Sequence, residues 1–272
     1  MRINNKLALL FLLIGIFSGV TVGVYSYYSA KKALVSRTFD QLKSLKVVKK
    51  KQIEGFYADR IRDINLFAQS EDVSKLLTII STNSKFQSNE IAQYEYNRYF
   101  NRYIQSCGYY EQFIVGDTLG NIIFTEVTES KPDFNFVLDT IKSKLLKNVF
   151  NKTILSKQTI IQDYQNDNDK PLSYIASPIE NNNGKLIGVI AMEISLNSIN
   201  KIMLENNNQS GLGNTGETYL VGSDFLMRSC SRFKEQSVLS THVRTKASIN
   251  ALNNIDSTEI IKDYRNINVL SS

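Results

Sequence analysis

A single uncharged stretch near the N-terminus limits what this chain can fold into. No charged residue lies between Lys6 and Lys31, and the stretch opens with LALLFLLIGIFSGVTVGV, Leu7 to Val24. About 20 helical residues cross a hydrocarbon core of about 30 Å, so the stretch is long enough to span a membrane. The tyrosines of Tyr25–Tyr28 follow it, where an interfacial aromatic belt is expected. We therefore predict that residues 1–28 are an uncleaved transmembrane anchor.

A cleaved signal peptide is the main alternative interpretation of this stretch. The apolar core of a signal peptide usually has only about 7–15 residues, and Tyr28-Ser29-Ala30 is a poor small-x-small cleavage site. A buried core helix is a further alternative, but the stretch has no capping signals. Basic residues flank it on both sides, so a positive-inside count mildly favours a cytoplasmic domain after the span and does not decide the orientation.

A long helix is predicted after the anchor. From Ser29 to about Leu77 there is no Pro and one Gly, and apolar residues between Leu42 and Phe67 recur at mostly three- and four-residue spacing. This pattern predicts a stalk helix within residues 29–80. Its middle carries five lysines, Lys43, Lys46, Lys49, Lys50 and Lys51. We interpret them as a solvated face, with a phosphate-binding patch as the alternative.

The next part of the chain alternates helical and strand-like runs. An aromatic-rich helix is expected over Glu90–Ser106, and further helices near Phe136–Phe150 and over Ser198–Asn206. Turn residues separate about five strand-like runs: Tyr109–Val115, Asn121–Thr125, Thr159–Asp163, Ser173–Ile179 and Leu186–Ile194. A long helix, short helices and antiparallel strands in this order predict an α+β, PAS-like sensor domain.

Composition and motifs argue against several other functions. Lys plus Arg minus Asp plus Glu is 32 − 26 = +6, which permits nucleic-acid binding without arguing for it. Cys107 and Cys230 cannot build a thiolate zinc site alone, and free thiols are expected. His242, the single histidine, has no carboxylate or nucleophile near it in the sequence. Since no P-loop, His-Glu-x-x-His or Cys-x-x-Cys motif occurs, we expect no catalysis, metal, cofactor or nucleic-acid partner in this chain.

Four sequence runs resemble a known family of sensors. The run GLGNTGETYLVGSDFLMRSCSRF, Gly211–Phe233, closely resembles the opening of the membrane-proximal module of double Cache sensor regions. The run SPIENNNGKLIGVIAMEIS, Ser177–Ser195, resembles the closing hairpin of the distal module, and VRTKASINAL and DYRNINVLSS also resemble the proximal module. Double Cache regions are the extracytoplasmic ligand-binding parts of bacterial chemoreceptors, sensor kinases and cyclases.

The resemblance implies two modules after the stalk. A membrane-distal, PAS-like Cache module is expected over residues 81–200 and an incomplete membrane-proximal module over residues 201–272. The second module would lack strands that the family has, so we expect loose packing beyond about Asn250. The alternative is that Gly211–Ser272 closes its own sheet.

The resemblance also implies a ligand site in the distal module. Asp163 in IIQDYQ and Glu193 in GVIAMEIS match acidic pocket positions of the family, and carboxylates suit a ligand ammonium group. Tyr174 and Phe113 are the expected apolar walls. The family's Arg-x-Trp-Tyr clamp for a ligand carboxylate has no counterpart, because the chain contains no Trp. The alternative is that these residues only shape strands, turns and core.

These features together predict a receptor. The expected function is extracytoplasmic small-molecule sensing, with an amine-bearing ligand, in a bacterial inner-membrane receptor of chemotaxis or two-component type. The resemblance further implies a homodimer that forms through the long helix. One alternative is an anchored binding or scaffold module without signalling output. Another is the sensory part of a kinase or cyclase whose catalytic domain lies outside this chain.

Overall fold

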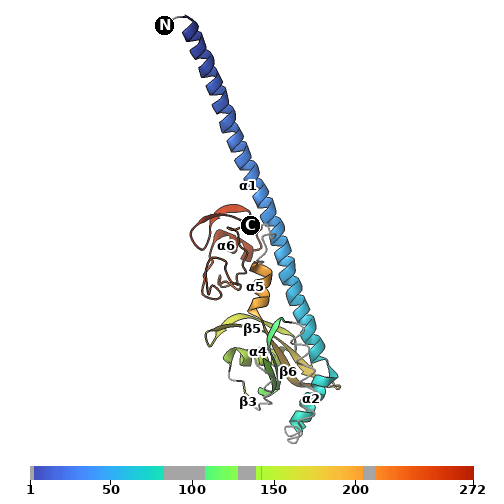
Figure 1. Ribbon diagram of the computed structural model, residues 1–272. Helices are drawn as coiled ribbons and strands as arrows, with labels where there is room; N and C mark the ends of the chain where they lie inside the picture. Colours follow the sequence, from blue (N-terminus) through green and yellow to red (C-terminus); the bar gives the residue numbers. More distant parts are fainter. Residues whose placement is uncertain (1–2, 83–107, 128–138, 142, 205–211) are drawn as a thin grey trace. The chain divides into compact units, whose positions relative to one another are not determined.

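The computed structural model of the chain describes residues 3–82, 108–127, 139–141, 143–204 and 212–272 (Figure 1). The helix predicted over Glu90–Ser106 and the residue Cys107 lie outside these ranges. The chain divides into two compact units. One comprises residues 49–243, and the other comprises residues 1–48 together with residues 244–272.

The longest element is helix α1, Ile3–Ala68, which contains the uncharged stretch and most of the predicted stalk. A second helix, α2, covers Glu71–Thr82, so the stalk helix ends earlier than the predicted range of residues 29–80. The Ser70 hydroxyl accepts a hydrogen bond from the Asp72 amide at 3.2 Å, and acidic residues occupy the first turn of α2. A serine cap and an acidic first turn both favour a new helix start, which explains the break.

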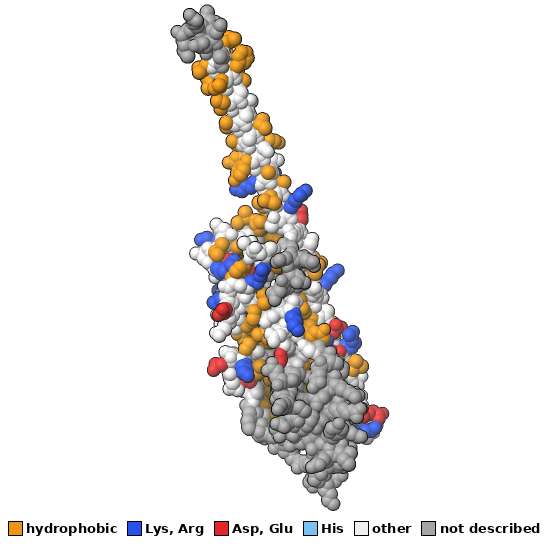
Figure 2. Space-filling view, viewed as in Figure 1, with side chains coloured by type: hydrophobic (Ala, Val, Ile, Leu, Met, Phe, Trp, Pro, Cys, Tyr) orange, Lys and Arg blue, Asp and Glu red, His pale blue; other side chains and the backbone are white. Residues whose placement is uncertain are grey.

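The N-terminal part of α1 exposes an apolar surface. Its large side chains are more than half exposed from Leu7 to Tyr28, and Figure 2 shows hydrophobic side chains covering this part of the helix. Among the described helices, α1 is the one that is long and apolar enough to cross a membrane. Length and composition alone therefore make it a candidate span.

The unit formed by residues 49–243 contains a six-stranded sheet. Its strands are β1 (Tyr110–Asp117), β2 (Asn121–Val127), β3 (Asp139–Thr140), β4 (Ile160–Asp167), β5 (Lys170–Glu180) and β6 (Leu186–Ile194). They lie in the order β3-β2-β1-β6-β5-β4, and all pairs are antiparallel. The α+β class predicted from the sequence is confirmed.

Helices cover both faces of this sheet. The C-terminal part of α1, helix α2 and helix α5 (Leu196–Leu204) pack on one face, which we call the α1 face; Phe113 and Met192 point into this core. Helix α4 (Lys144–Ser156) packs on the other, the α4 face, where Tyr174 and Ala191 contribute to a separate core. In β1, β5 and β6, successive buried residues therefore alternate between the two cores.

Side chains and glycines build the connections next to these strands. Ser143 caps α4 by accepting a hydrogen bond from the Leu146 amide at 3.0 Å. Between β5 and β6, the Asn181 side chain accepts hydrogen bonds from the Asn183 and Lys185 amides, both at 3.0 Å. Gly184 completes this turn with a φ of +70°, a conformation that suits glycine. The predicted Asn181–Gly184 turn is thus confirmed.

Two glycines let the central strands approach closely. A Cβ atom on Gly188 of β6 would lie 2.5 Å from the Gly116 carbonyl oxygen of β1 and 2.9 Å from Leu77 Cδ1. A Cβ atom on Gly116 would lie 2.7 Å from Phe150 Cε1. Neither position has room for a side chain: Gly188 is required by the packing of β6 against β1, and Gly116 by the packing of α4 on β1.

One lysine of the predicted solvated face is buried, which corrects that interpretation. Lys43, Lys50 and Lys51 are exposed, but Lys49 is buried and its ammonium donates a hydrogen bond to the Ile202 carbonyl. Ile202 lies in the last turn of α5, where carbonyl groups lack helical partners and attract a cation. Lys49 therefore fixes the end of α5 to α1.

Residues 212–243 of the same unit consist mainly of turns, with isolated bridges joining Val221 to Met227 and Leu226 to His242. In the other unit, helix α6 (Lys246–Leu252) precedes a hairpin of β7 (Glu259–Lys262) and β8 (Asn268–Ser271). Every residue of the hairpin is half-buried or exposed. Loose packing beyond Asn250 stays a prediction for hydrogen exchange.

Candidate functional site

Four neighbouring strands align a row of polar side chains on the α4 face. Gln112 of β1 and Tyr174 of β5 are the direct cross-strand partners of Glu193 in β6, and Gln162 of β4 is the partner of Tyr174. Directly paired residues present their side chains on the same face of a sheet. We call these four residues, Gln112, Glu193, Tyr174 and Gln162, the Glu193 row.

The members of the row differ in burial and in polar partners. Tyr174 belongs to the α4-face core, and Gln162 is buried. The Gln112 amide donates a hydrogen bond to the Thr125 hydroxyl at 2.8 Å. Lys152 of α4 donates to Gln162 Oε1 at 3.4 Å. The row therefore offers donors, acceptors and one half-buried carboxyl group beside an apolar wall.

The pKa of Glu193 lies near neutral pH. Burial and, to a smaller extent, the negative charge of Glu111 together raise the pKa of Glu193 to about 7, and Lys170 partly opposes this shift. Burial also raises the pKa of Tyr174, with a contribution from the Glu193 charge. A positive group placed next to this carboxyl would favour its ionised form. The row therefore suits a cationic group of a ligand.

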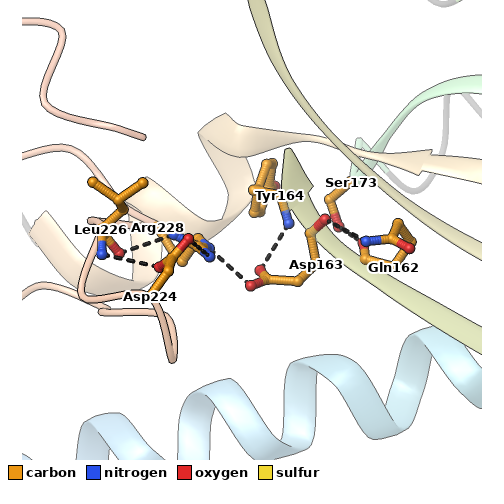
Figure 3. A network of polar contacts seen from close by, with 7 residues as sticks. All are labelled: Gln162, Asp163, Tyr164, Ser173, Asp224, Leu226 and Arg228. Atoms are coloured by element: carbon orange, nitrogen blue, oxygen red, sulfur yellow. Dashed lines mark hydrogen bonds and ion pairs between the residues drawn. The ribbon is translucent and has the colours of Figure 1, made fainter. Parts of the chain in front are cut away.

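Asp163 lies in a different environment from Glu193. The register of β4 shifts between Gln162 and Gln165, next to Asp163. Asp163 Oδ1 accepts a hydrogen bond from the Tyr164 amide at 2.7 Å, and Oδ2 accepts one from Arg228 Nε at 2.8 Å (Figure 3). Arg228 also binds Asp224, and this hydrogen bond holds the pKa of Asp224 below its ordinary value. These groups line a cavity of about 430 Å³.

Phe113 lies in the core of the α1 face. It is fully buried, it pairs with Met192, and its ring contacts those of Phe67 and Tyr110, each with centroids 5.5 Å apart. Its neighbour Gln112 pairs with Glu193, so Phe113 and Glu193 point to opposite faces.

The structure therefore brings together only two of the four predicted site residues. Glu193 and Tyr174 are direct partners, whereas Phe113 lies across the sheet and Asp163 is bound to Arg228. The assignment of each residue to ligand binding stays a prediction. Sequence analysis missed Gln112, Gln162 and Arg228 as site residues. Strand register, which would have linked the two glutamines to Glu193, cannot be read from the sequence alone.

Comparison with family models identifies the relatives of the chain. The dCache_1 model, which describes a Cache domain, matches residues 30–263. The chain belongs to the double Cache family. The family membership predicted from the sequence is thus confirmed, and the match takes in α4, the whole Glu193 row and Arg228. No curated protein matches this double Cache chain.

Solved structures with the same fold are sensor domains. The sensory domain of the Campylobacter jejuni chemoreceptor Tlp3 (CcmL) has a TM-score of 0.56 and 17% identity, covering 85% of this chain and 87% of that chain. The sensor domain of the V. cholerae histidine kinase DctB has a TM-score of 0.52 and 14% identity, covering 82% and 76%, respectively. At these identities the likeness shows the double Cache fold alone.

Proposed function

We propose that this chain is the extracytoplasmic sensing region of a transmembrane receptor and binds a small molecule at the Glu193 row. The observation that carries the proposal is a half-buried carboxyl group in the middle of a polar row that crosses four strands. A carboxyl group placed there without a function would destabilise the sheet face that it occupies. Membership of the double Cache family supports a sensing role.

The chemistry of the row favours an amine-bearing ligand. An ammonium group would form a charge-assisted hydrogen bond with the Glu193 carboxylate. The Tyr174 ring and the apolar residues of the α4-face core would contact the rest of the molecule. Because Trp is absent from the chain, an Arg-x-Trp-Tyr clamp for a ligand carboxylate cannot form. The proposed ligand is therefore selected by its positive group.

The membrane context is part of the proposal. The apolar, exposed N-terminal part of α1 would anchor the receptor in the bacterial inner membrane, and residues after Tyr28 would lie outside the cytoplasm. Exposed apolar residues further along α1, among them Leu34 and Val47, support a homodimer that forms through this helix. Any catalytic output is proposed to lie outside this chain.

Glu193→Gln is expected to weaken binding of an amine ligand by about 100-fold, because the substitution removes the charge that pairs with the ammonium group. A thermal-shift screen of amines, amino acids, carboxylates and purines supplies the ligand, and calorimetry then measures its affinity. With a pKa of about 7, Glu193 is mostly protonated at about pH 6 and mostly ionised at about pH 8. The native protein should therefore bind about tenfold more tightly at the higher pH.

The Asp163→Asn variant is the matched control for this experiment. Asp163 is bound to Arg228, and its replacement should leave both the affinity and its pH dependence nearly unchanged. Equal binding by Glu193→Gln and the native protein, or a ligand set restricted to anions, would contradict the proposed site. Equal losses in both variants would place Asp163 in the ligand site.

A reporter enzyme that is active only after export is expected to be active when it is fused after Asn200. The expectation follows from the candidate span in α1 and from the family's extracytoplasmic role. The matched fusion uses a reporter that works only in the cytoplasm and should be inactive at the same position. Activity of the cytoplasmic reporter there would overturn the proposed topology.

A further inference from the structure

The Arg228 side chain joins two parts of the fold that are distant in sequence. Its Nε donates a hydrogen bond to Asp163 Oδ2 of β4 at 2.8 Å, over a separation of 65 residues. Its Nη2 donates to Asp224 Oδ2 at 2.9 Å and its Nη1 to the Leu226 carbonyl at 3.0 Å (Figure 3). One guanidinium group therefore fastens the turn at Asp224 to strand β4.

The groups in this contact differ in their access to water. The Arg228 side chain is only 11% exposed, whereas those of Asp163 and Asp224 are 53% and 47% exposed. The cavity beside them also reaches Gln165 and Leu239. Water and salt weaken charge pairs that they can reach. These two ion pairs can therefore break while the apolar core of the sheet stays intact.

Residues 219–231, a run that includes Asp224 and Arg228, have a second attachment that is uncharged. The Cys230 amide donates a hydrogen bond to Asn200 Oδ1 of α5 at 2.7 Å, and Asn200 Nδ2 donates to Cys230 Sγ at 3.2 Å. Salt does not screen a neutral pair as it screens an ionic one. Residues 219–231 are thus held to β4 by charges and to α5 by neutral hydrogen bonds.

We propose that Asp163, Asp224 and Arg228 form a two-state ionic latch between β4 and residues 219–231. In the closed state, seen in this structure, the run moves with β4. In the open state the run keeps its hydrogen bonds to α5 and to residues 239–243, but charges no longer hold it to β4. β4 is an edge strand with a single neighbour, so it has more freedom to move than the central strands. The latch needs no ligand and therefore goes beyond the proposed function.

Hydrogen exchange on the full chain in detergent micelles tests the latch. The reporters are the amide of Arg228, which donates to the Leu220 carbonyl at 2.8 Å, and the amide of Leu220, which donates to Ser229 Oγ at 3.0 Å. Asp163→Asn should raise their exchange rates by about tenfold at about 50 mM NaCl. In the native protein about 500 mM NaCl should produce a similar rise, and the variant should show little further change.

Two further variants distinguish a latch from general stabilisation. The Leu220 amide should exchange no faster in Asp163→Asn combined with Arg228→Gln than in Asp163→Asn alone, because the ionic partner of Arg228 on β4 is Asp163, which both variants lack. Asn200→Ala should raise exchange of the same amides but keep the salt dependence of the native protein. Unchanged exchange in Asp163→Asn would overturn the proposal. So would an equal rise in the amides of β6, since it would show global unfolding.

Discussion

Arg60→Ala is expected to lower the free energy of unfolding by about 3–5 kcal/mol. The Arg60 side chain is 7% exposed and that of Asp63 is 14% exposed, and their ion pair has an Nη2–Oδ2 distance of 3.0 Å. The guanidinium carbon lies 4.2 Å from the centroid of the Tyr109 ring, and the Tyr110 hydroxyl donates to Asp63 Oδ2 at 3.0 Å. Removing Arg60 leaves the carboxylate largely buried without its countercharge, which is the costly half of a buried pair.

Urea denaturation of the full chain in detergent micelles, followed by near-ultraviolet circular dichroism, measures this loss. The same helix provides a control, because Arg62 pairs with Asp59 at 2.9 Å at the same three-residue spacing, with the two charges in the reverse order. These side chains are 67% and 49% exposed, so Arg62→Ala should cost less than about 0.5 kcal/mol. Equal losses in the two variants would show that burial does not set the strength of the Arg60 pair.

Gly188→Ala is expected to lower the free energy of unfolding by about 2–3 kcal/mol, although it adds a single methyl group. The new Cβ atom would lie 2.5 Å from the Gly116 carbonyl oxygen, which belongs to the backbone of the paired strand and cannot rotate away. Urea denaturation of the full chain in detergent micelles measures this loss as well. The loss should be accompanied by faster hydrogen exchange in β1 and β6.

Gly55→Ala provides the control of opposite sign. Gly55 lies inside α1, and a Cβ atom at this position would have no atom within 4 Å beyond its own helical backbone and chain neighbours. Alanine there should raise the free energy of unfolding by about 0.5–1 kcal/mol, because it reduces the entropy of the unfolded chain. A neutral Gly188→Ala would show that β1 and β6 can separate without loss, contrary to the packing described above.

Local signals predicted most of the elements. The apolar run Leu186–Ile194 and the Asn181–Gly184 turn predicted the hairpin of β5 and β6 with nearly correct ends, because both signals reside in neighbouring residues. The end of α1 was missed because the stalk was predicted from the lack of Pro and the single Gly up to about Leu77, and neither residue marks the break at Ser70. The capping signals at Ser70 and Glu71 were present in the sequence, and they end the helix in the structure.

The candidate site was less predictable than the fold. Its assembly depends on strand register, and a shift of one residue moves a side chain to the other face. Gln112 rather than Phe113 pairs with Glu193, so an aromatic residue expected in the site lies in the opposite core. The partners of Lys49 and Asp163 are distant in sequence, and no local pattern names Ile202 or Arg228.

The two faces of the sheet also bear on how such a receptor could diversify. Residues of the Glu193 row belong to the α4 face, while the contacts that hold α1 involve the other face. In the proposed receptor, substitutions in the row would therefore alter ligand preference while leaving the α1 contacts in place. A few substitutions on one face of the sheet would then change ligand specificity, while the packing of α1 on the other face would be preserved.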